Sequence, residues 1–134
     1  MTATERAVEL TIAAAEAADE KLAHDIVAFD VSDQLAITDV FLVCSGSNER
    51  QVGAIVDEIQ RRLAERFDLK PLRREGDREN RWVLLDYFDI VVHVQDDEER
   101  TFYDLERLWK DCPRIALPES VTRPNSSVGG GGSN

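Results

Sequence analysis

The stretch that decides the fold is Arg81–Trp109, RWVLLDYFDIVVHVQDDEERTFYDLERLW. Two apolar runs of strand length flank Asp86–Asp89, and a helical pattern follows over Asp97–Lys110. The stretch therefore predicts a β-hairpin, Trp82–Gln95, that leads into an amphipathic helix. A purely structural hairpin does not need the polar and aromatic residues set into this frame, which are Trp82, Asp86, Tyr87, Asp89, His93, Arg100 and Tyr103. They indicate a recognition surface or an active site.

The register of the hairpin decides which of these side chains meet. If Asp86–Asp89 form the connection, Leu85 pairs with Ile90 and Trp82 lies opposite His93, with Cβ atoms about 5 Å apart. One interpretation is a buried tryptophan beside a core histidine. An exposed aromatic patch is favoured because helical phase places Tyr103 and Arg100 away from the expected core stripe, which consists of Phe102, Leu105, Leu108 and Trp109.

The rest of the chain predicts an α/β fold with a mixed β-sheet flanked by helices. Helices are expected over residues 4–22 and 49–67, strands over 24–31, 40–45 and 70–75. The order α-β-β-α-β-β-β-α places a strand–helix–strand crossover in the middle, which favours a parallel step, and the final hairpin adds antiparallel strands. The run Val40–Ser45 is apolar throughout, as is typical of a strand buried on both faces.

Length and composition predict a single soluble domain. A chain of 134 residues with 43% hydrophobic and 32% charged residues is long enough to bury its own core. We assign residues 1–117 to the domain and 118–134, which hold four of the seven glycines, to a flexible Gly/Ser/Pro-rich tail. No apolar run approaches a membrane span, and the two cysteines have unrelated contexts, so a reduced, cytoplasmic protein is expected.

The net charge of −11 argues against nucleic-acid binding through the overall field of the protein. Between Arg61 and Arg81, however, eight cations stand against five acids, which leaves a local charge of +3. This segment is either a solvated helix and strand rim or a patch that faces RNA or an acidic partner.

An enzyme is the alternative to a recognition surface. Gly46-Ser47, between a buried strand and a helix, resembles the glycine-serine turn of metal-dependent nucleotidyltransferases. Those enzymes also need two carboxylates on one strand face for Mg²⁺, whereas Asp86 and Asp89 are spaced by three and would point to opposite faces of a continuous strand. The acidic run Asp96–Glu99 is better explained as a helix start, where the macrodipole favours negative charge. No metal or cofactor is therefore expected.

Several separated motifs match a known family in register. They are Asp30-Val31-Ser32, Ile37-Thr38-Asp39, the run Ser45–Val52, Trp82, the run Leu85–Val94 and the run Arg100–Trp109. In this order, over about residues 7–110, they resemble the ribosomal silencing factor S family, also called the Iojap family.

The resemblance implies a nucleotidyltransferase-like fold without enzymatic activity. It implies docking on the large ribosomal subunit, on the protein numbered fourteen at the subunit interface, which blocks the small subunit sterically and represses translation. It also implies a homodimer when the protein is free, and we add a peripheral contact with ribosomal RNA through the basic segment. By resemblance, the contact residues are Trp82, Asp86, Tyr87, His93, Arg100 and Tyr103, with Glu75 and Asp89 nearby.

Overall fold

The computed structural model describes residues 2–76 and 78–122. The elements follow in the order α1 (Glu5–Glu20), β1 (His24–Asp30), β2 (Val40–Gly46), α2 (Glu49–Phe67), β3 (Arg73–Glu75), β4 (Trp82–Asp86), β5 (Ile90–Asp96), α3 (Asp97–Phe102), α4 (Leu105–Leu108) and α5 (Glu119–Thr122). The predicted order of helices and strands is thus confirmed up to the last helix, which is divided in two. No helix in these described ranges is long and apolar enough to cross a membrane.

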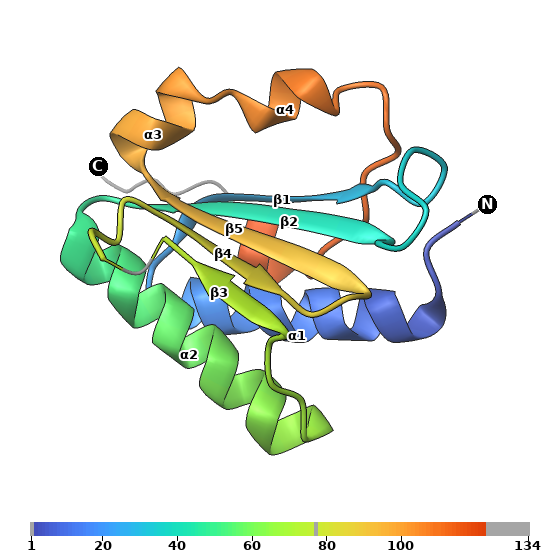
Figure 1. Cartoon of the computed structure of the whole chain (residues 1–134), viewed down its shortest axis with the longest axis horizontal. Coiled ribbons are helices and arrows are strands. Elements are labelled where there is room, and N and C mark those ends of the chain that lie inside the picture. Colours follow the sequence, from blue (N-terminus) through green and yellow to red (C-terminus); the bar gives the residue numbers. More distant parts are fainter. Residues whose placement is uncertain (1, 77, 123–134) are drawn as a thin grey trace.

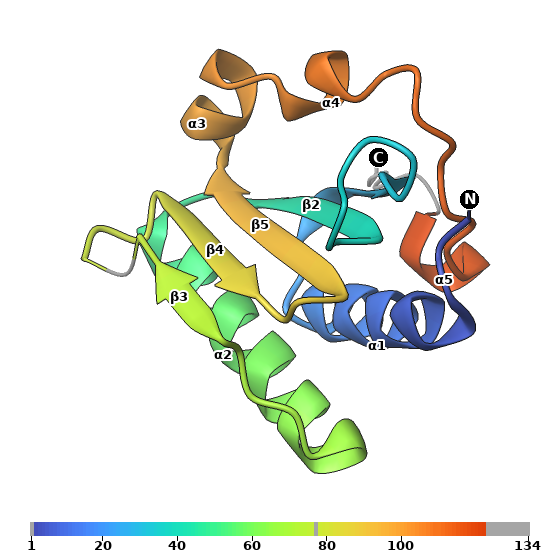
Figure 2. The same cartoon turned by 45° about the vertical axis from the view of Figure 1, so that its right-hand side comes forward.

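The strands form one mixed five-stranded sheet in the order β1-β2-β5-β4-β3. The central strands β2 and β5 run parallel, and the other three neighbouring pairs are antiparallel. Helices α1 and α2 cover one face, and the short helices α3 and α4 lie over the other (Figures 1 and 2). The predicted α/β class with a mixed sheet is therefore confirmed, and β3 is the basic edge strand expected before the hairpin.

The main core lies between the sheet and α1 and α2. Helix α1 begins where the Thr4 hydroxyl accepts a hydrogen bond from the backbone N–H of Ala7, and its alanine-rich face lets it pack closely on the sheet. Helix α2 begins at an Asn48 cap and buries an apolar stripe at helical spacing, as predicted: Val52, Ile55, Val56, Ile59 and Leu63. These contacts fix the sheet on one side and leave its other face for α3 and α4.

A charged cluster joins α1 and α2 beside this core. Glu58, 6% exposed, pairs with Arg61 and Arg62 on its own helix, and Arg62 reaches Glu20 of α1 at 3.0 Å. The hydrogen bonds from Arg61 and Arg62 hold the pKa of Glu58 below its usual value although burial alone would raise it. The cluster therefore keeps the carboxylate charged against the apolar layer.

The predicted hairpin register is wrong by two residues. Leu85 pairs with Val92, Leu84 with His93 and Trp82 with Gln95. The connection is tighter than expected because the Asp86 carboxylate accepts a hydrogen bond from the N–H of Phe88, which adopts a left-handed φ of 74°. A shift of two keeps every side chain on its predicted face, so Trp82 and His93 still share one face but are diagonal neighbours instead of directly opposite.

The predicted helix Asp97–Lys110 is interrupted at Tyr103, which has a non-helical backbone (φ −103°, ψ 85°). Asp104 then caps α4 by accepting a hydrogen bond from the N–H of Arg107. The break changes the helical phase, so the expected core residues Phe102 and Leu108 are 75% and 69% exposed. The predicted core stripe is therefore wrong at these two positions.

The structure also differs from the predicted tail boundary. Residues 119–122 form α5, and Val121 is buried in the core next to α1. The described fold thus extends past residue 117, and the remainder of the predicted tail, residues 123–134, lies outside the described residues.

Candidate functional site

A cluster of aromatic side chains lies on the face of the sheet that α3 and α4 cover. Its members come from β4, β5 and the α3–α4 junction. The indole Nε1 of Trp82 donates to Nδ1 of His93 at 3.2 Å, and the Trp82 ring lies 4.9 Å from the Tyr103 ring between centroids. His93 is 5% exposed, Trp82 is half-buried and Tyr103 is 44% exposed. A buried histidine thus supports two partly exposed rings, so the favoured exposed patch is found for Trp82 and Tyr103 but is wrong for His93.

His93 orients the indole of Trp82. Burial lowers the pKa of His93 to about 4, so the imidazole is neutral near pH 7. Because Nδ1 accepts the indole hydrogen bond, the proton of the neutral ring resides on Nε2. Phe41, whose ring centroid lies 5.0 Å from that of His93, packs beside it. A neutral, fixed acceptor therefore fixes the direction of the Trp82 ring.

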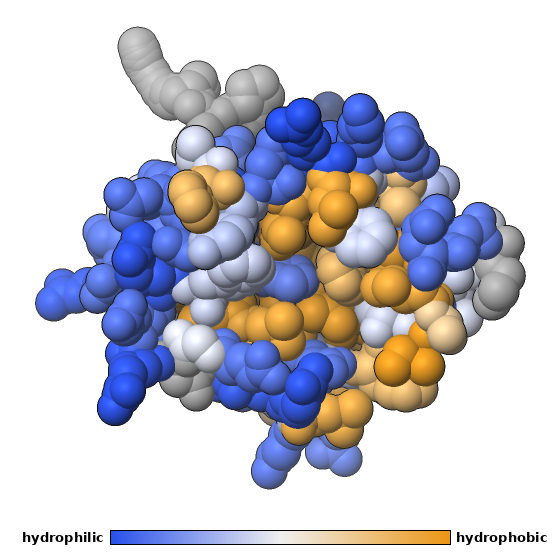
Figure 3. All heavy atoms as spheres, turned by 45° about the horizontal axis from the view of Figure 1, so that its top comes forward, coloured by the Kyte–Doolittle hydropathy of each residue, from blue (hydrophilic) through white to orange (hydrophobic). Residues whose placement is uncertain are grey.

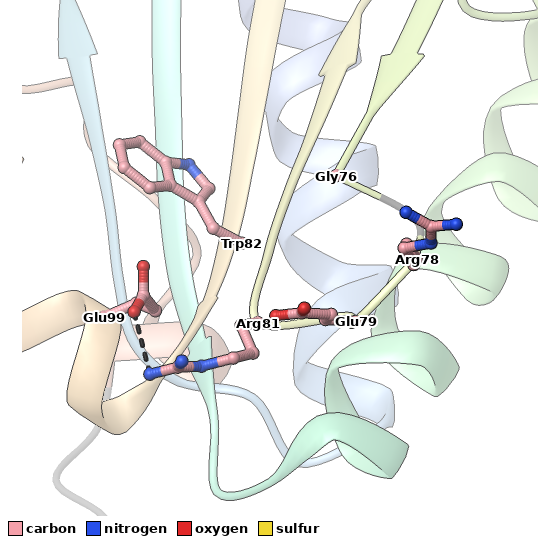
Figure 4. A pocket seen from close by; sticks show the side chains of 6 residues that line it. All are labelled: Gly76, Arg78, Glu79, Arg81, Trp82 and Glu99. Atoms are coloured by element: carbon pink, nitrogen blue, oxygen red, sulfur yellow. Dashed lines mark ion pairs between the residues drawn. The ribbon is translucent and has the colours of Figure 1, made fainter.

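An open pocket of about 290 Å³ lies beside Trp82 and is lined by Gly76, Arg78, Glu79, Arg81, Trp82 and Glu99. Figure 4 shows the indole and the Glu99 carboxylate on one side of Arg81, and Arg78 and Glu79 on the other. Arg81 pairs with Glu99 at 2.9 Å and Glu98 at 2.6 Å. Two glutamates, two arginines and the indole of Trp82 thus line one pocket.

Glycine is required where the chain turns into this pocket. Gly76 has φ +87°, and a Cβ there would lie 1.9 Å from the carbonyl oxygen of Trp82. Only a residue without a Cβ allows the β3–β4 connection to approach β4 this closely. The turn therefore sets the position of Arg78 and Glu79 against Trp82.

The prediction that Arg100 faces solvent is wrong. Its side chain is 9% exposed and donates to Ser45 Oγ on β2 at 2.7 Å and to Glu106 Oε1 on α4 at 2.9 Å. Arg100 and Tyr103 were expected on one side of a continuous helix, and therefore exposed together. Because the helix is interrupted at Tyr103, the two side chains do not share a side. Arg100 consequently lies beneath the helices, and Tyr103 lies at the surface.

The other predicted residues are divided between the two faces of the sheet. Glu75 pairs with Leu84 across the β3–β4 ladder and Asp86 with Arg73, so both acids share the face of Trp82. Tyr87 is 2% exposed in the core, and burial raises its pKa to about 12. Asp89 is half-buried at the turn, where its carbonyl accepts from Asp39 and Val40. A partner cannot reach the Tyr87 ring in this fold.

Leu84 lies half-buried between Trp82 and Asp86 on this face, as alternation along β4 predicts. Sequence reasoning missed the exposure of Phe102 and Leu108, because the break at Tyr103 has no signal in the hydrophobic spacing. Figure 3 shows apolar side chains gathered in the middle of the face that carries α3 and α4, with hydrophilic ones around them. This arrangement is typical of a protein interface.

The geometry does not support the nucleotidyltransferase alternative. Asp86 lies beside Val91 in the ladder, whereas Gly46 lies beside Asp96 at the other end of β5, about 16 Å away at the usual strand rise. Asp96 itself caps α3 through the N–H of Glu99, which confirms the helix-start interpretation of the acidic run. Across residues 2–76 and 78–122, no group of three or more His, Cys, Asp or Glu side chains could hold a metal ion.

Comparisons with known proteins agree with the arrangement of motifs. The family model "Ribosomal silencing factor during starvation" matches residues 4–129. A ribosomal silencing factor of Bacillus subtilis is 45% identical over 104 residues, covering 78% of this chain and 87% of the relative. One of Halalkalibacterium halodurans is 41% identical over 109 residues, covering 81% and 92%. A crystal structure of a protein from Chromobacterium violaceum superposes with a TM-score of 0.73 at 32% identity, covering 87% of this chain and 95% of that one. The chain belongs to the ribosomal silencing factor family.

Proposed function

We propose that this protein docks on the large ribosomal subunit, on the protein numbered fourteen at the subunit interface, and represses translation by blocking the small subunit sterically. The protein acts in the cytoplasm, is a homodimer when free, and uses no catalytic step, metal or cofactor. Membership of the silencing factor family supports the role in translation. The observation that carries the docking surface is the contact between the partly exposed rings of Trp82 and Tyr103, whose planes are inclined by 44°.

The chemistry of the surface suits a basic partner. Tryptophan and tyrosine are the residues most often found at interface hot spots, and here His93 and Tyr103 hold the indole in one orientation. Glu79, Glu99 and the exposed Glu98 lie near the rings together with Arg78 and Arg81, and Arg81 pairs with Glu98 and Glu99. A lysine or arginine of the partner can lie against the indole face and share these carboxylates with Arg81. The aromatic side chains thus anchor the complex, and the acids steer its approach.

The remaining contacts follow from position on this face. Glu75 and Asp86 lie along the same side of β3 and β4, and Asp89 lies at the adjoining turn, so all three belong to the rim of the proposed surface. Tyr87 is left out because its ring is buried. His93 and Arg100 contribute from beneath the surface.

Contact of the basic segment with ribosomal RNA is peripheral in this proposal. Most of its arginines already pair with acids of the protein: Arg61 with Glu58 and Glu65, Arg62 with Glu20 and Glu58, Arg66 with Glu16, Arg73 with Glu75 and Asp86, Arg74 with Asp57, and Arg81 with Glu98 and Glu99. A cation that is already paired gains less from a phosphate. Affinity is therefore expected to come mainly from the protein partner.

Substitution of Trp82 tests the docking surface. Trp82→Ala should lose more than about 2 kcal/mol of affinity, or about thirtyfold, for purified large subunits in a co-sedimentation titration. Trp82→Phe, which keeps an aromatic ring, should lose less. Glu9→Ala is the matched control, because Glu9 is exposed on α1, which covers the opposite face of the sheet. Unchanged co-sedimentation of Trp82→Ala would contradict the proposed surface.

A subunit-association assay tests the mechanism. Large subunits incubated with excess protein should fail to form complete ribosomes when small subunits are added, as followed on sucrose gradients. Trp82→Ala should restore association at the same concentration, and Glu9→Ala should not. Full reassociation in the presence of saturating, bound wild-type protein would remove the steric model.

A further inference from the structure

Arg100 connects three elements beneath the aromatic surface. It extends from α3, donates through one guanidinium nitrogen to Ser45 Oγ on β2 at 2.7 Å, and through the other to Glu106 Oε1 on α4 at 2.9 Å. The side chain is 9% exposed. A single side chain thus fixes α3 on the sheet and α4 on α3.

Few other polar contacts hold the inner side of these helices. Asp97 pairs with His24 at 2.5 Å and Glu98 with Arg81 at 2.6 Å, but Asp97 is 57% and Glu98 80% exposed, so both pairs lie at the rim. Arg81 also pairs with Glu99 of α3 at 2.9 Å, with side chains 37% and 18% exposed. Beneath the helices, the Gln95 amide, His93 Nε2 and Trp109 Nε1 are buried with no hydrogen-bond partner among the described residues. Among these links between α3 and the sheet, the one from Arg100, at 9% exposure, is the most deeply buried.

Tyr103 lies at the junction between the two helices that Arg100 joins. Its N–H ends α3 by donating to the carbonyl of Glu99, and Asp104 begins α4 directly afterwards. Since the backbone of Tyr103 is not helical, its direction depends on how α3 and α4 are placed on either side. The guanidinium fixes both placements, and the ring lies 4.9 Å from Trp82.

We propose that Arg100 is a positioning residue: acting through Ser45 and Glu106, it holds Tyr103 against Trp82 in the orientation that docking requires, without touching the partner. The inference rests on the proposed function, because it assigns Arg100 a role in the same surface. It changes the expectation from family resemblance, which places Arg100 in direct contact.

The chemistry explains why arginine fits this position. Its planar fork presents donors in two fixed directions, here toward a hydroxyl on the sheet and a carboxylate on α4. A lysine has one ammonium on a flexible stem and cannot reproduce both directions at once. Arg100→Lys therefore keeps the charge but should release one of the two elements, and Tyr103 should lose its fixed direction.

A double-mutant cycle on affinity for purified large subunits tests this role. Arg100→Lys should weaken binding about tenfold, as is typical of coupled residues in contact. In a Tyr103→Ala background the same change should have little further effect, because Arg100 acts through that ring. Glu106→Gln, which keeps the hydrogen bond from Arg100 to Ser45, should weaken binding less, and this effect too should disappear in the Tyr103→Ala background. Arg107→Lys, exposed on α4, is the matched control and should bind as the wild type does.

A spectroscopic measurement on the free protein separates this inference from docking. The indole N–H resonance of Trp82, assigned against Trp109→Phe, should move in Arg100→Lys toward its position in Tyr103→Ala, because the ring current of Tyr103 is displaced. Additive losses in the cycle would mean that Arg100 acts independently of Tyr103 and would overturn the proposal. If wild-type protein fails to bind subunits, the proposed function fails, and an unmoved Trp82 resonance would separately overturn the positioning role.

Discussion

Acid should destabilise this protein through His93 before most carboxylates titrate. Burial lowers the pKa of His93 to about 4, whereas the unfolded chain has the usual value of 6.5. Below pH 6.5 the unfolded state therefore binds a proton that the folded state excludes. Stability from this residue is complete above pH 6.5 and is lost as pH falls through 4, and the full loss below pH 4 is about 3 kcal/mol.

The loss at an intermediate pH can be worked from the same two pKa values. At pH 5.0 the unfolded histidine is almost fully protonated and the folded one is about one-tenth protonated, which gives a loss of about 2 kcal/mol relative to pH 7.5. Most carboxylates with ordinary pKa values near 4 remain ionised at pH 5.0. Urea unfolding at the two pH values, followed by far-UV circular dichroism, measures the difference.

The matched variant is His93→Gln, which can still accept the Trp82 hydrogen bond but cannot titrate. Its free energy of unfolding should be lower than that of the wild type at pH 7.5 because the ring packing is lost, yet it should change about 2 kcal/mol less between pH 7.5 and 5.0. Equal pH dependence in the two proteins would refute the reasoning. So would a histidine resonance in the folded protein that titrates near pH 6.5 and is assigned to His93.

Three further substitutions test the packing. Gly76→Ala should lower the free energy of unfolding, measured in urea, by about 1–3 kcal/mol, because the new Cβ would meet the Trp82 carbonyl and φ is positive. Gly53→Ala is the comparison and should cost less, because its Cβ would meet only the flexible Asn80 amide. Glu58→Gln should destabilise at pH 7, because Arg61 would keep only Glu65 and Arg62 only Glu20 as an ion-pair partner. The gap to the wild type should close in thermal melts as pH falls through the depressed folded pKa of Glu58. Phe102→Ser should leave the melting temperature within about 2 °C, since the ring is 75% exposed.

The sheet and the helices α1 and α2 could be predicted from the sequence because the spacing of their apolar residues matches the side chains that are buried. The stripe of α2 and the apolar run of β2 are each buried as their patterns require. Trp82 and His93 could be placed on one face because side chains alternate along β4 and β5, even though the register was wrong by two. Local pattern thus located the aromatic face.

The prediction failed where local hydrogen bonds override the pattern. The Asp86 carboxylate tightens the hairpin turn, and the Asp104 cap interrupts the last helix. Neither event changes hydrophobic spacing, so periodicity alone could not reveal it. The second had the larger effect, because it exposed Phe102 and buried Arg100.

The position of β5 between β2 and β4 affects how the chain folds as it is made. Residues 90–96 are the last strand to be synthesised, yet they occupy the centre of the sheet and supply both of its middle ladders. Until residues 90–96 leave the ribosome, β2 and β4 each have one edge without its partner strand. The middle of the sheet can therefore form only after nearly the whole domain has been synthesised. Trp82, His93 and Tyr103 meet only after that step. A prematurely ended chain would therefore lack the surface that we propose for docking on the ribosome.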